Sequence, residues 1–263
     1  MTALSHTISD STTMLRRNLR HALRYPSLTL IVAGMPIVFL LLFVYVLGGT
    51  LGAGLGGPSG GRAEYVEYLA PGLLVLAVAA AAQGTAISVA MDMTQGIIAR
   101  FRTMSIARAA VLAGHVGGAV VQTMVGLALV LGAALLVGFR PDAGPGEWPA
   151  AIGLLALVSL ALSWLSTAMG LATKTVEAAS NAPMPLILLP FLSSAFVPTD
   201  TMPTGLAWFA EHQPFTPIIE ALRACLEGRD PGADAWWAVG WCVAIIAVCS
   251  WWAGRLFQKV RAV

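Results

Sequence analysis

The side chains best suited to chemistry lie in a basic stretch at 92–108, which reads DMTQGIIARFRTMSIAR. Its arginines are Arg100, Arg102 and Arg108, and its apolar residues at helical spacing are Ile97, Ile98, Phe101 and Met104. This spacing predicts a short amphipathic helix. Two interpretations stay open: a solvated segment resting on lipid headgroups, or a helix that docks on a soluble partner and passes force to its neighbours.

Enzymatic chemistry is not indicated by the sequence. It has no Ser-His-Asp arrangement, no HExxH motif and no paired carboxylates within an apolar segment. The string GLATKT is not a nucleotide-binding loop, because Thr173 stands where the second glycine must be. The glycine-rich stretch 48–61 also lacks the required lysine motif. We therefore expect no catalytic residue, no metal site and no cofactor on this chain.

The three cysteines do not form a recognisable framework. Cys242 and Cys249 are seven residues apart on one apolar segment, which separates them by roughly 10.5 Å along a helix. A disulfide needs Cα atoms within about 7 Å, so these two cannot pair. Cys225 stands apart, and no metal-ligand spacing is present.

The composition indicates that lipid is the main solvent of this chain. Of its 263 residues 57% are hydrophobic and 11% are charged, whereas a soluble domain has about 25% charged residues. A net charge of +2 is too small to indicate a nucleic-acid partner. We expect one all-α membrane domain over residues 1–263, in contact with membrane lipid.

Six apolar stretches are candidates for transmembrane helices, given that roughly 20 residues cross a bilayer. They are 28–47, 70–91, 109–137, 150–172, 182–197 and 236–254. Residues 12–24 carry leucines on one face and arginines on the other, which predicts an interfacial amphipathic helix. Residues 198–234 predict two short amphipathic helices, either re-entrant from the outer side or wholly external.

The charges on the connecting segments predict the orientation. The N-terminal segment, 92–108 and the C-terminal tail have net charges of +3, +2 and +3. The segments 62–67, 140–147 and 198–234 have net charges of −1, −1 and −4. By the positive-inside rule, both termini and 92–108 are cytoplasmic. No cleavable signal peptide is evident, so we expect the first apolar segment to stay as an uncleaved anchor.

Small and polar residues inside the spans predict packing surfaces. Gly114, Gly118 and Gln122 are four residues apart, a spacing that lets another helix approach closely. Gln83 and Gln122 are candidates for polar groups along a transport pathway. His115 has two interpretations, a proton site or, more commonly, a hydrogen-bonded structural residue. No charged residue lies in the middle of a span, which argues against an ion-coupled carrier and favours an energy source on another subunit.

Two stretches carry a resemblance to a known family. DMTQGIIARFRTMSIARAAVLAG is similar to the cytoplasmic coupling segment of ABC-2 type transporter permeases of the daunorubicin-resistance branch. PFLSSAFVPTDTMPTGLAWFAEHQPFTPIIEALRACLEG resembles the fifth span and re-entrant region of the same branch. Two positions depart from the family pattern: Ser105 stands in place of a proline and His115 in place of an arginine.

The resemblance implies a permease subunit of an exporter in a bacterial plasma membrane. It implies a permease homodimer joined to two copies of a separate ATP-binding-cassette ATPase, which binds ATP and Mg. It implies an amphipathic drug, antibiotic or lipid-like substrate. The implied coupling contacts are Gly96, Arg100, Phe101, Arg102 and Met104. The alternatives are a stand-alone secondary carrier or channel and a non-transporting assembly protein.

Overall fold

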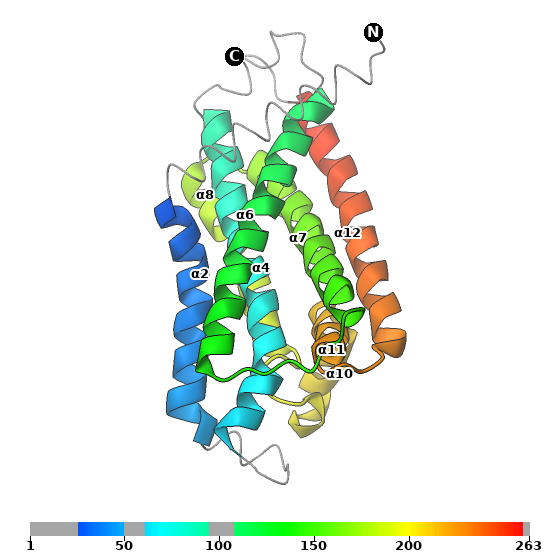
Figure 1. Ribbon diagram of the computed structural model, residues 1–263. Coiled ribbons are helices and arrows are strands. Elements are labelled where there is room, and N and C mark those ends of the chain that lie inside the picture. The colour runs from blue at the N-terminus through cyan, green and yellow to red at the C-terminus, as the bar shows by residue number, and fades with distance from the viewer. Residues whose placement is uncertain (1–25, 50–60, 95–107, 260–263) are drawn as a thin grey trace.

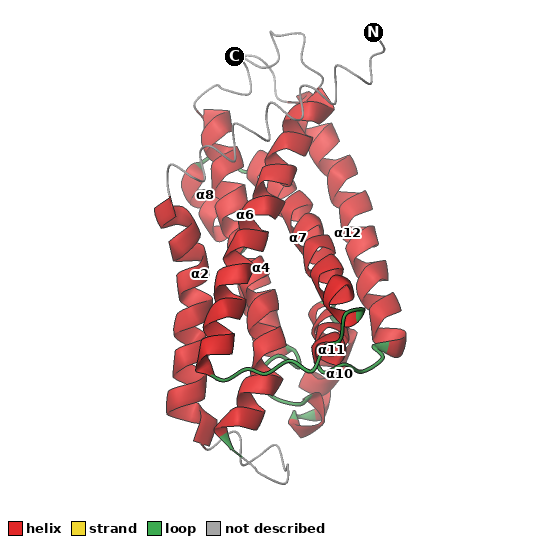
Figure 2. Ribbon diagram, in the orientation of Figure 1, coloured by secondary structure: helices red, strands yellow, loops and turns green. Residues whose placement is uncertain are grey.

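The computed structural model describes residues 26–49, 61–94 and 108–259, and within these ranges it contains helices and turns but no strand (Figures 1 and 2). The all-helical class is therefore confirmed for the described chain. The predicted interfacial helix at 12–24 and residues 95–107 of the basic stretch lie outside it. The elements are α2 (Pro26–Leu41), the π-helix η1 (Leu42–Leu47), α4 (Arg62–Thr94), α6 (Arg108–Val137), α7 (Glu147–Ala172), α8 (Val176–Asn181), α9 (Met184–Leu188), the 3₁₀ helices η2 (Leu189–Leu192) and η3 (Thr199–Thr201), α10 (Thr204–His212), α11 (Phe215–Leu226) and α12 (Gly232–Lys259).

The long helices form a bundle in which α2, α4, α6 and α7 alternate in direction, whereas α12 runs in the same direction as α7 (Figure 1). Four helices are long and apolar enough to cross a membrane, within 63–94, 112–137, 147–172 and 232–257. The described apolar helices at 33–47 and 176–192 are shorter. They correspond to the first and fifth predicted spans, so a count of six crossings stays a prediction.

Helix α4 begins at Arg62, well before the predicted start at residue 70. Pro71 consequently lies inside the helix rather than in its first turn. Hydropathy indicates where the apolar part of a helix ends, whereas backbone hydrogen bonds decide where the helix itself ends. Residues Arg62 to Glu67 are polar in part, but they continue the helical backbone of α4. The segment 174–181, between the fourth and fifth predicted spans, contains α8, and the Thr175 side chain caps this helix by accepting a hydrogen bond from the Ala178 N–H.

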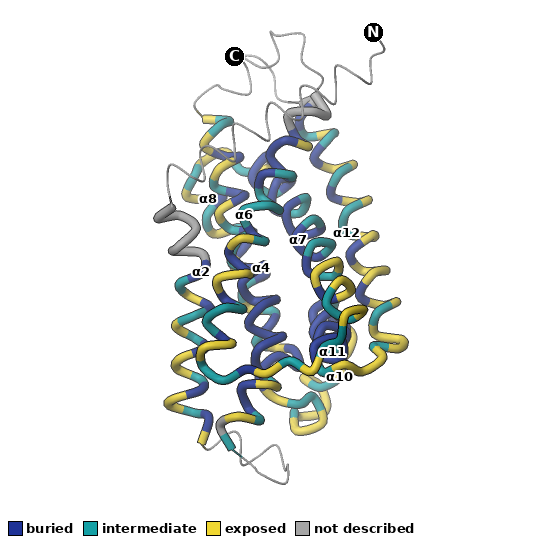
Figure 3. The backbone as a smooth tube through the Cα atoms, viewed as in Figure 1, coloured by how far each residue is buried: buried dark blue, intermediate teal, exposed yellow. Residues whose placement is uncertain are grey.

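Helix α4 is the centre of the bundle. It packs against α2, α6, α7, α8 and α11, and the residues from Leu73 to Ala79 are all buried. The most apolar window of α4 is 67% buried, against 17% for α12, whose outer face is exposed (Figure 3). The exposed apolar side chains of α12 therefore face lipid or another subunit in a membrane protein.

Two glycines let the backbones of neighbouring segments approach α4. A Cβ atom at Gly72 would lie 2.7 Å from the Cβ and 2.8 Å from the carbonyl oxygen of Ala195. A Cβ atom at Gly170, on α7, would lie 2.7 Å from the carbonyl oxygen of Ala86, on α4. Small residues at both positions are thus required by the packing, as is common between membrane helices.

The segment at 182–197 is a broken helix. It divides into α9, η2 and a non-helical end, and Pro183, Pro185 and Pro190 explain the breaks because proline removes a helical hydrogen bond. The chain then turns back through α10 to α11, which packs against α4, α7 and α12. Every residue of α11 is buried except Glu220, which is half-buried. Helix α11 is therefore enclosed by the bundle rather than laid on its surface.

Candidate functional site

The five residues that the resemblance assigns to coupling, Gly96, Arg100, Phe101, Arg102 and Met104, lie outside the described residues. The structure does place the helices on either side of them. Helix α4 ends at Thr94 and α6 begins at Arg108, and these two points lie at the same end of the bundle, together with α8 (Figure 1). We call this the inner end and the opposite end, with α10 and α11, the outer end.

The predicted polar and small residues of the spans lie at helix contacts. Gln83 donates a hydrogen bond from Nε2 to the carbonyl oxygen of Ser180, over 2.7 Å, and so joins α4 to α8. Gly114 and Gly118 are buried on α6, and Gln122 is half-buried there. A Cβ atom at Gly126, one helical repeat further, would meet nothing within 4 Å. Their roles in packing or transport stay a prediction.

The inner end holds a close contact between an aspartate and a histidine that the sequence did not reveal. Asp92, two residues before the end of α4, has its Oδ2 atom 3.0 Å from Nε2 of His115 on α6. The His115 side chain is 7% exposed and the Asp92 side chain is 16% exposed. A partly desolvated pair at this distance interacts more strongly than a surface pair, because water screens it less. It joins the two helices that the basic stretch connects.

A larger polar cluster lies at the outer end, around Arg223 of α11. The Arg223 guanidinium donates from Nη2 to the carbonyl oxygens of Tyr68, at 3.1 Å, and Ser194, at 2.9 Å. It also donates from Nη1 to Oε1 of Glu220, at 2.5 Å, and lies over the Tyr68 ring, 3.9 Å from its centroid. The Tyr68 hydroxyl donates to the same Ser194 carbonyl, at 2.8 Å. We call these four residues the Arg223 cluster.

The Arg223 cluster makes a buried charge tolerable. Arg223 is 4% exposed, and because an arginine stays protonated, its charge at that depth would be strongly destabilising without partners. Here the planar guanidinium fork matches two carbonyl oxygens and one carboxylate at once, which a lysine ammonium cannot do with the same geometry. The cluster thereby ties α4, the end of the broken helix and α11 to one another.

The same end of the broken helix is capped by a second side chain. The Gln213 amide donates from Nε2 to the carbonyl oxygens of Leu189 and Leu192, at 3.2 and 3.0 Å. The Ser193 hydroxyl donates to the Pro190 carbonyl oxygen, at 2.6 Å. Carbonyls at the end of a helix have no partner in the helix itself, and in lipid each would be costly. These bonds allow an interrupted helix at this depth.

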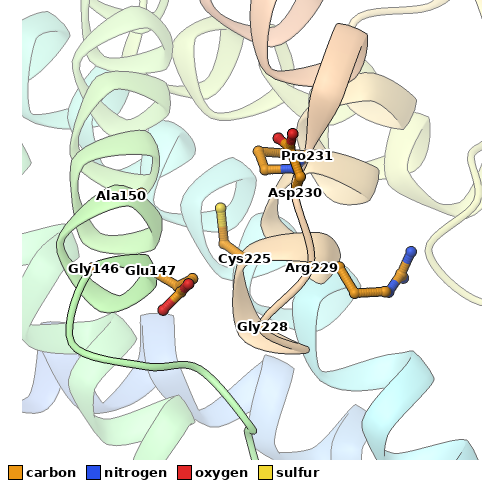
Figure 4. Close-up of a pocket in the computed structure, with 8 residues that line it drawn as sticks. All are labelled: Gly146, Glu147, Ala150, Cys225, Gly228, Arg229, Asp230 and Pro231. Atoms are coloured by element: carbon orange, nitrogen blue, oxygen red, sulfur yellow. The ribbon is translucent and has the colours of Figure 1, made fainter.

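An open cavity of about 350 Å³ lies at the outer end, where the loop before α7 meets the turn between α11 and α12 (Figure 4). It is lined by Gly146, Glu147, Ala150, Cys225, Gly228, Arg229, Asp230 and Pro231. Burial, with the carboxylates of Glu147 and Asp230, raises the pKa of the Cys225 thiol. Arg229 points away from the other charged side chains of the cavity and pairs with Glu227. The carboxylates of Glu147 and Asp230 make the lining of this cavity acidic.

The described residues contain no cluster of three or more histidine, cysteine or acidic side chains that could hold a metal ion. Cys225, Cys242 and Cys249 are free thiols, as the spacing of the last two predicted. In the sequence Arg223 lies within the 198–234 segment, which resembles the family's re-entrant region. No local pattern indicated its burial, because two of its partners are main-chain carbonyls from segments 155 and 29 residues away.

Comparison with known proteins assigns the chain to a family. A family model described as ABC-2 type transporter matches residues 10–226. A daunorubicin resistance ABC transporter permease protein of Streptomyces coeruleorubidus is 30% identical over 261 residues, which cover 97% of this chain and 88% of that protein. A probable doxorubicin resistance ABC transporter permease protein of Mycobacterium tuberculosis is 25% identical over 223 residues, which cover 82% and 76% of the two chains. The chain is a multi-pass membrane protein that belongs to the ABC-2 type transporter family.

Proposed function

We propose that this chain is the permease subunit of an ATP-driven exporter that moves an amphipathic drug, antibiotic or lipid-like compound out of the cell. The observation that carries the proposal is the 97% coverage of the chain by a drug-resistance permease. The absence of a nucleotide-binding motif from the sequence supports a separate ATPase, which binds ATP and Mg. Two permeases and two ATPases form the assembly that the family resemblance implies.

The basic stretch at 92–108 is the docking element for the ATPase in this proposal. Support comes from its position in the chain, since it follows α4, the most buried of the four long apolar helices, and precedes α6. A push on this stretch reaches the centre of the bundle directly through α4. The charge distribution supports a cytoplasmic location for it and for both termini. Gly96, Arg100, Phe101, Arg102 and Met104 are the proposed contacts.

The segment at 198–234 is re-entrant in this proposal. Support comes from α11, whose burial against α4, α7 and α12 favours a position at the depth of those helices. Arg223 and Gln213 donate hydrogen bonds to backbone carbonyl oxygens that would otherwise have no partner at this depth. The exporter therefore has a hydrogen-bonded closure on its outer side, where substrate leaves.

The proposal is tested with the permease and its cognate ATP-binding-cassette ATPase, co-expressed and reconstituted in vesicles with doxorubicin as the probe. We expect the double substitution Arg100→Ala with Phe101→Ala to lower drug-stimulated ATP hydrolysis and transport about tenfold, or roughly 1.4 kcal/mol of coupling. Arg255→Ala is the matched control, because Arg255 is an exposed arginine of α12 outside the docking stretch. It should leave both rates unchanged.

Two results would contradict the proposal. Transport of the probe by the permease alone, without an ATPase, would indicate a stand-alone carrier or channel. Unchanged coupling in the double variant, with normal membrane insertion, would refute the assignment of Arg100 and Phe101 as contacts.

A further inference from the structure

We propose that the open cavity beside Cys225, here called the outer cavity, binds the ammonium group of a small organic cation. Its lining combines two carboxylates, those of Glu147 and Asp230, with the apolar side chains of Ala150 and Pro231 (Figure 4). The role of the site rests on the proposed function, because it makes a cationic amphipathic compound the substrate that leaves at this end. Binding itself is a property of the permease chain alone.

A close backbone contact forms the outer cavity. Gly228 has a φ of 67°, a conformation that favours glycine, and a Cβ atom there would lie 2.9 Å from the carbonyl oxygen of Asp142. The turn between α11 and α12 therefore lies directly against the loop before α7. The cavity between these segments has a volume of about 350 Å³, which is within the range of small-molecule sites.

The two carboxylates of the lining are not neutralised by the residues around them. Oδ1 of Asp230 accepts a hydrogen bond from the Gly232 N–H, at 3.0 Å, which holds the side chain but leaves its charge. Glu147 is half-buried in the first turn of α7, where the helix N-terminus favours a negative charge. Neither carboxylate forms an ion pair with another described residue, and Arg229 is paired with Glu227 instead. A cation that enters the cavity therefore meets uncompensated negative charge.

The Cys225 side chain is a second and independent feature of the outer cavity. Cys225 is 4% exposed, and its sulfur atom lies between α7 and the turn that carries Asp230 (Figure 4). Its thiol has neither a disulfide nor a hydrogen-bond partner among the described residues. A thiol behaves as a small and mainly apolar group, so it can contact the organic part of a ligand. The cavity thus has an apolar, buried wall beneath an acidic rim.

The composition of the lining favours an organic ammonium ion over a metal ion. The part of the chain that the structure describes contains no group of three histidine, cysteine or acidic side chains that could hold a metal. Calcium and magnesium prefer several oxygen ligands, whereas an ammonium group on an organic body needs few polar contacts and also fills apolar space. The outer connecting segments, with net charges of −1, −1 and −4, attract cations to this end.

The test uses Cys225 as a reporter in the full-length permease, purified in lipid nanodiscs. Its modification is followed by mass spectrometry of the peptide that contains it. Two methanethiosulfonate reagents are compared, one with a trimethylammonium group and one with a sulfonate group. We expect the preference of Cys225 for the cationic reagent to exceed that of free 2-mercaptoethanol about tenfold. The ratio of the two rates is independent of the pKa of the thiol, because both reagents react with the same thiolate.

Removal of the two carboxylates should abolish this preference. In Glu147→Gln with Asp230→Asn it should decrease to within about twofold of the value for 2-mercaptoethanol. Glu211→Gln is the matched control and should keep the wild-type preference, because Glu211 is an exposed carboxylate of α10 outside the cavity. Cys242 is 0% exposed, so its modification would reveal a loss of fold. If the double variant shows such a loss, the two single variants replace it, each with a preference lowered about threefold.

Protection by a ligand measures binding directly. Benzylamine, which carries an ammonium group at neutral pH, should slow the modification of Cys225 about fivefold when it is in excess over its Kd. Benzyl alcohol, a neutral molecule of nearly the same shape, should not protect, and the double variant should lose the protection by benzylamine.

Three results would overturn the proposal: no preference for the cationic reagent, equal protection by benzylamine and benzyl alcohol, or protection by Ca²⁺ without protection by benzylamine. The first would show that the carboxylates do not attract cations, the second that the cavity is only an apolar site, and the third that it is a metal site. Modification of Cys225 requires neither the ATPase nor ATP. Intact protection in a permease that does not transport with its ATPase would therefore support the cation site and count against the proposed function alone.

Discussion

The two ends of helix α4 are joined to their neighbours in different ways. At the outer end, the Arg223 cluster connects α4, α11 and the broken helix through several hydrogen bonds that share one guanidinium and one carbonyl. At the inner end, Oδ2 of Asp92 lies 3.0 Å from Nε2 of His115 on α6. A network with many members is broken only at high cost, because its hydrogen bonds support one another. The outer end is therefore built as a fixed joint.

Changes in the Arg223 cluster should act mainly on the stability of the permease, because three segments share its hydrogen bonds. The predictions below test the outer half of the comparison.

The largest effect is expected for Arg223→Gln. The substitution removes a buried charge and takes their donor from Glu220 and the Tyr68 carbonyl, while the Ser194 carbonyl keeps the Tyr68 hydroxyl. Breaking a buried pair costs about 3–5 kcal/mol. The midpoint of thermal unfolding in detergent, followed by tryptophan fluorescence, should decrease strongly. Arg223→Lys should recover part of the loss, because an ammonium keeps the charge but cannot reproduce the planar fork.

Arg229→Gln is the matched control for Arg223→Gln. Arg229 follows the same helix and pairs with Glu227, but its side chain is 61% exposed. Exposed pairs contribute little, so the change in stability should stay within about 0.5 kcal/mol. Equal destabilisation by the two variants would show that the buried cluster has no special role in stability. It would also contradict the difference drawn between the two ends of α4.

A second effect, of intermediate size, concerns the backbone contact beside the Arg223 cluster. Gly72→Ala would place a methyl group 2.8 Å from the Ala195 carbonyl oxygen, so the broken helix must shift away from α4. Overpacking of this kind costs about 1–3 kcal/mol. Gly126→Ala is the control, because its new methyl group meets nothing within 4 Å. A thermal midpoint that is equally low in both variants would contradict the close approach at Gly72.

The sequence predicted the class of the molecule better than its polar contacts. Apolar runs and helical spacing are local properties, so the all-helical class could be predicted from them. The start of α4 was missed because Arg62 and Glu67 look like a loop in hydropathy and yet continue the helix. The Thr175 cap was a local signal for α8 that could have been used.

The polar contacts were missed for a different physical reason. Asp92 and His115 are each visible in the sequence, but their pairing depends on the register between two helices, which spacing along one chain does not determine. The sequence around Arg223 is typical of an exposed charged residue. Its burial depends on the Tyr68 and Ser194 carbonyl oxygens, which only the folded chain places beside it. Residues that act across the bundle therefore need the three-dimensional arrangement, whereas residues that build one helix do not.

The smallest effect, and the sharpest test of the Arg223 cluster, is expected for Tyr68→Phe. The substitution removes one hydroxyl, whose hydrogen bond to the Ser194 carbonyl is 2.8 Å long, and keeps the aromatic ring beneath the guanidinium. Because Arg223 still donates to that carbonyl, the oxygen keeps a hydrogen-bond partner, and the free energy of unfolding should decrease by about 1 kcal/mol. In the Arg223→Gln background the same change should cost more, since the Ser194 carbonyl then loses its last donor in the cluster. Thermal unfolding of the two single variants and the double variant measures this coupling, and strictly additive losses would show that the two donors act independently rather than as one closure.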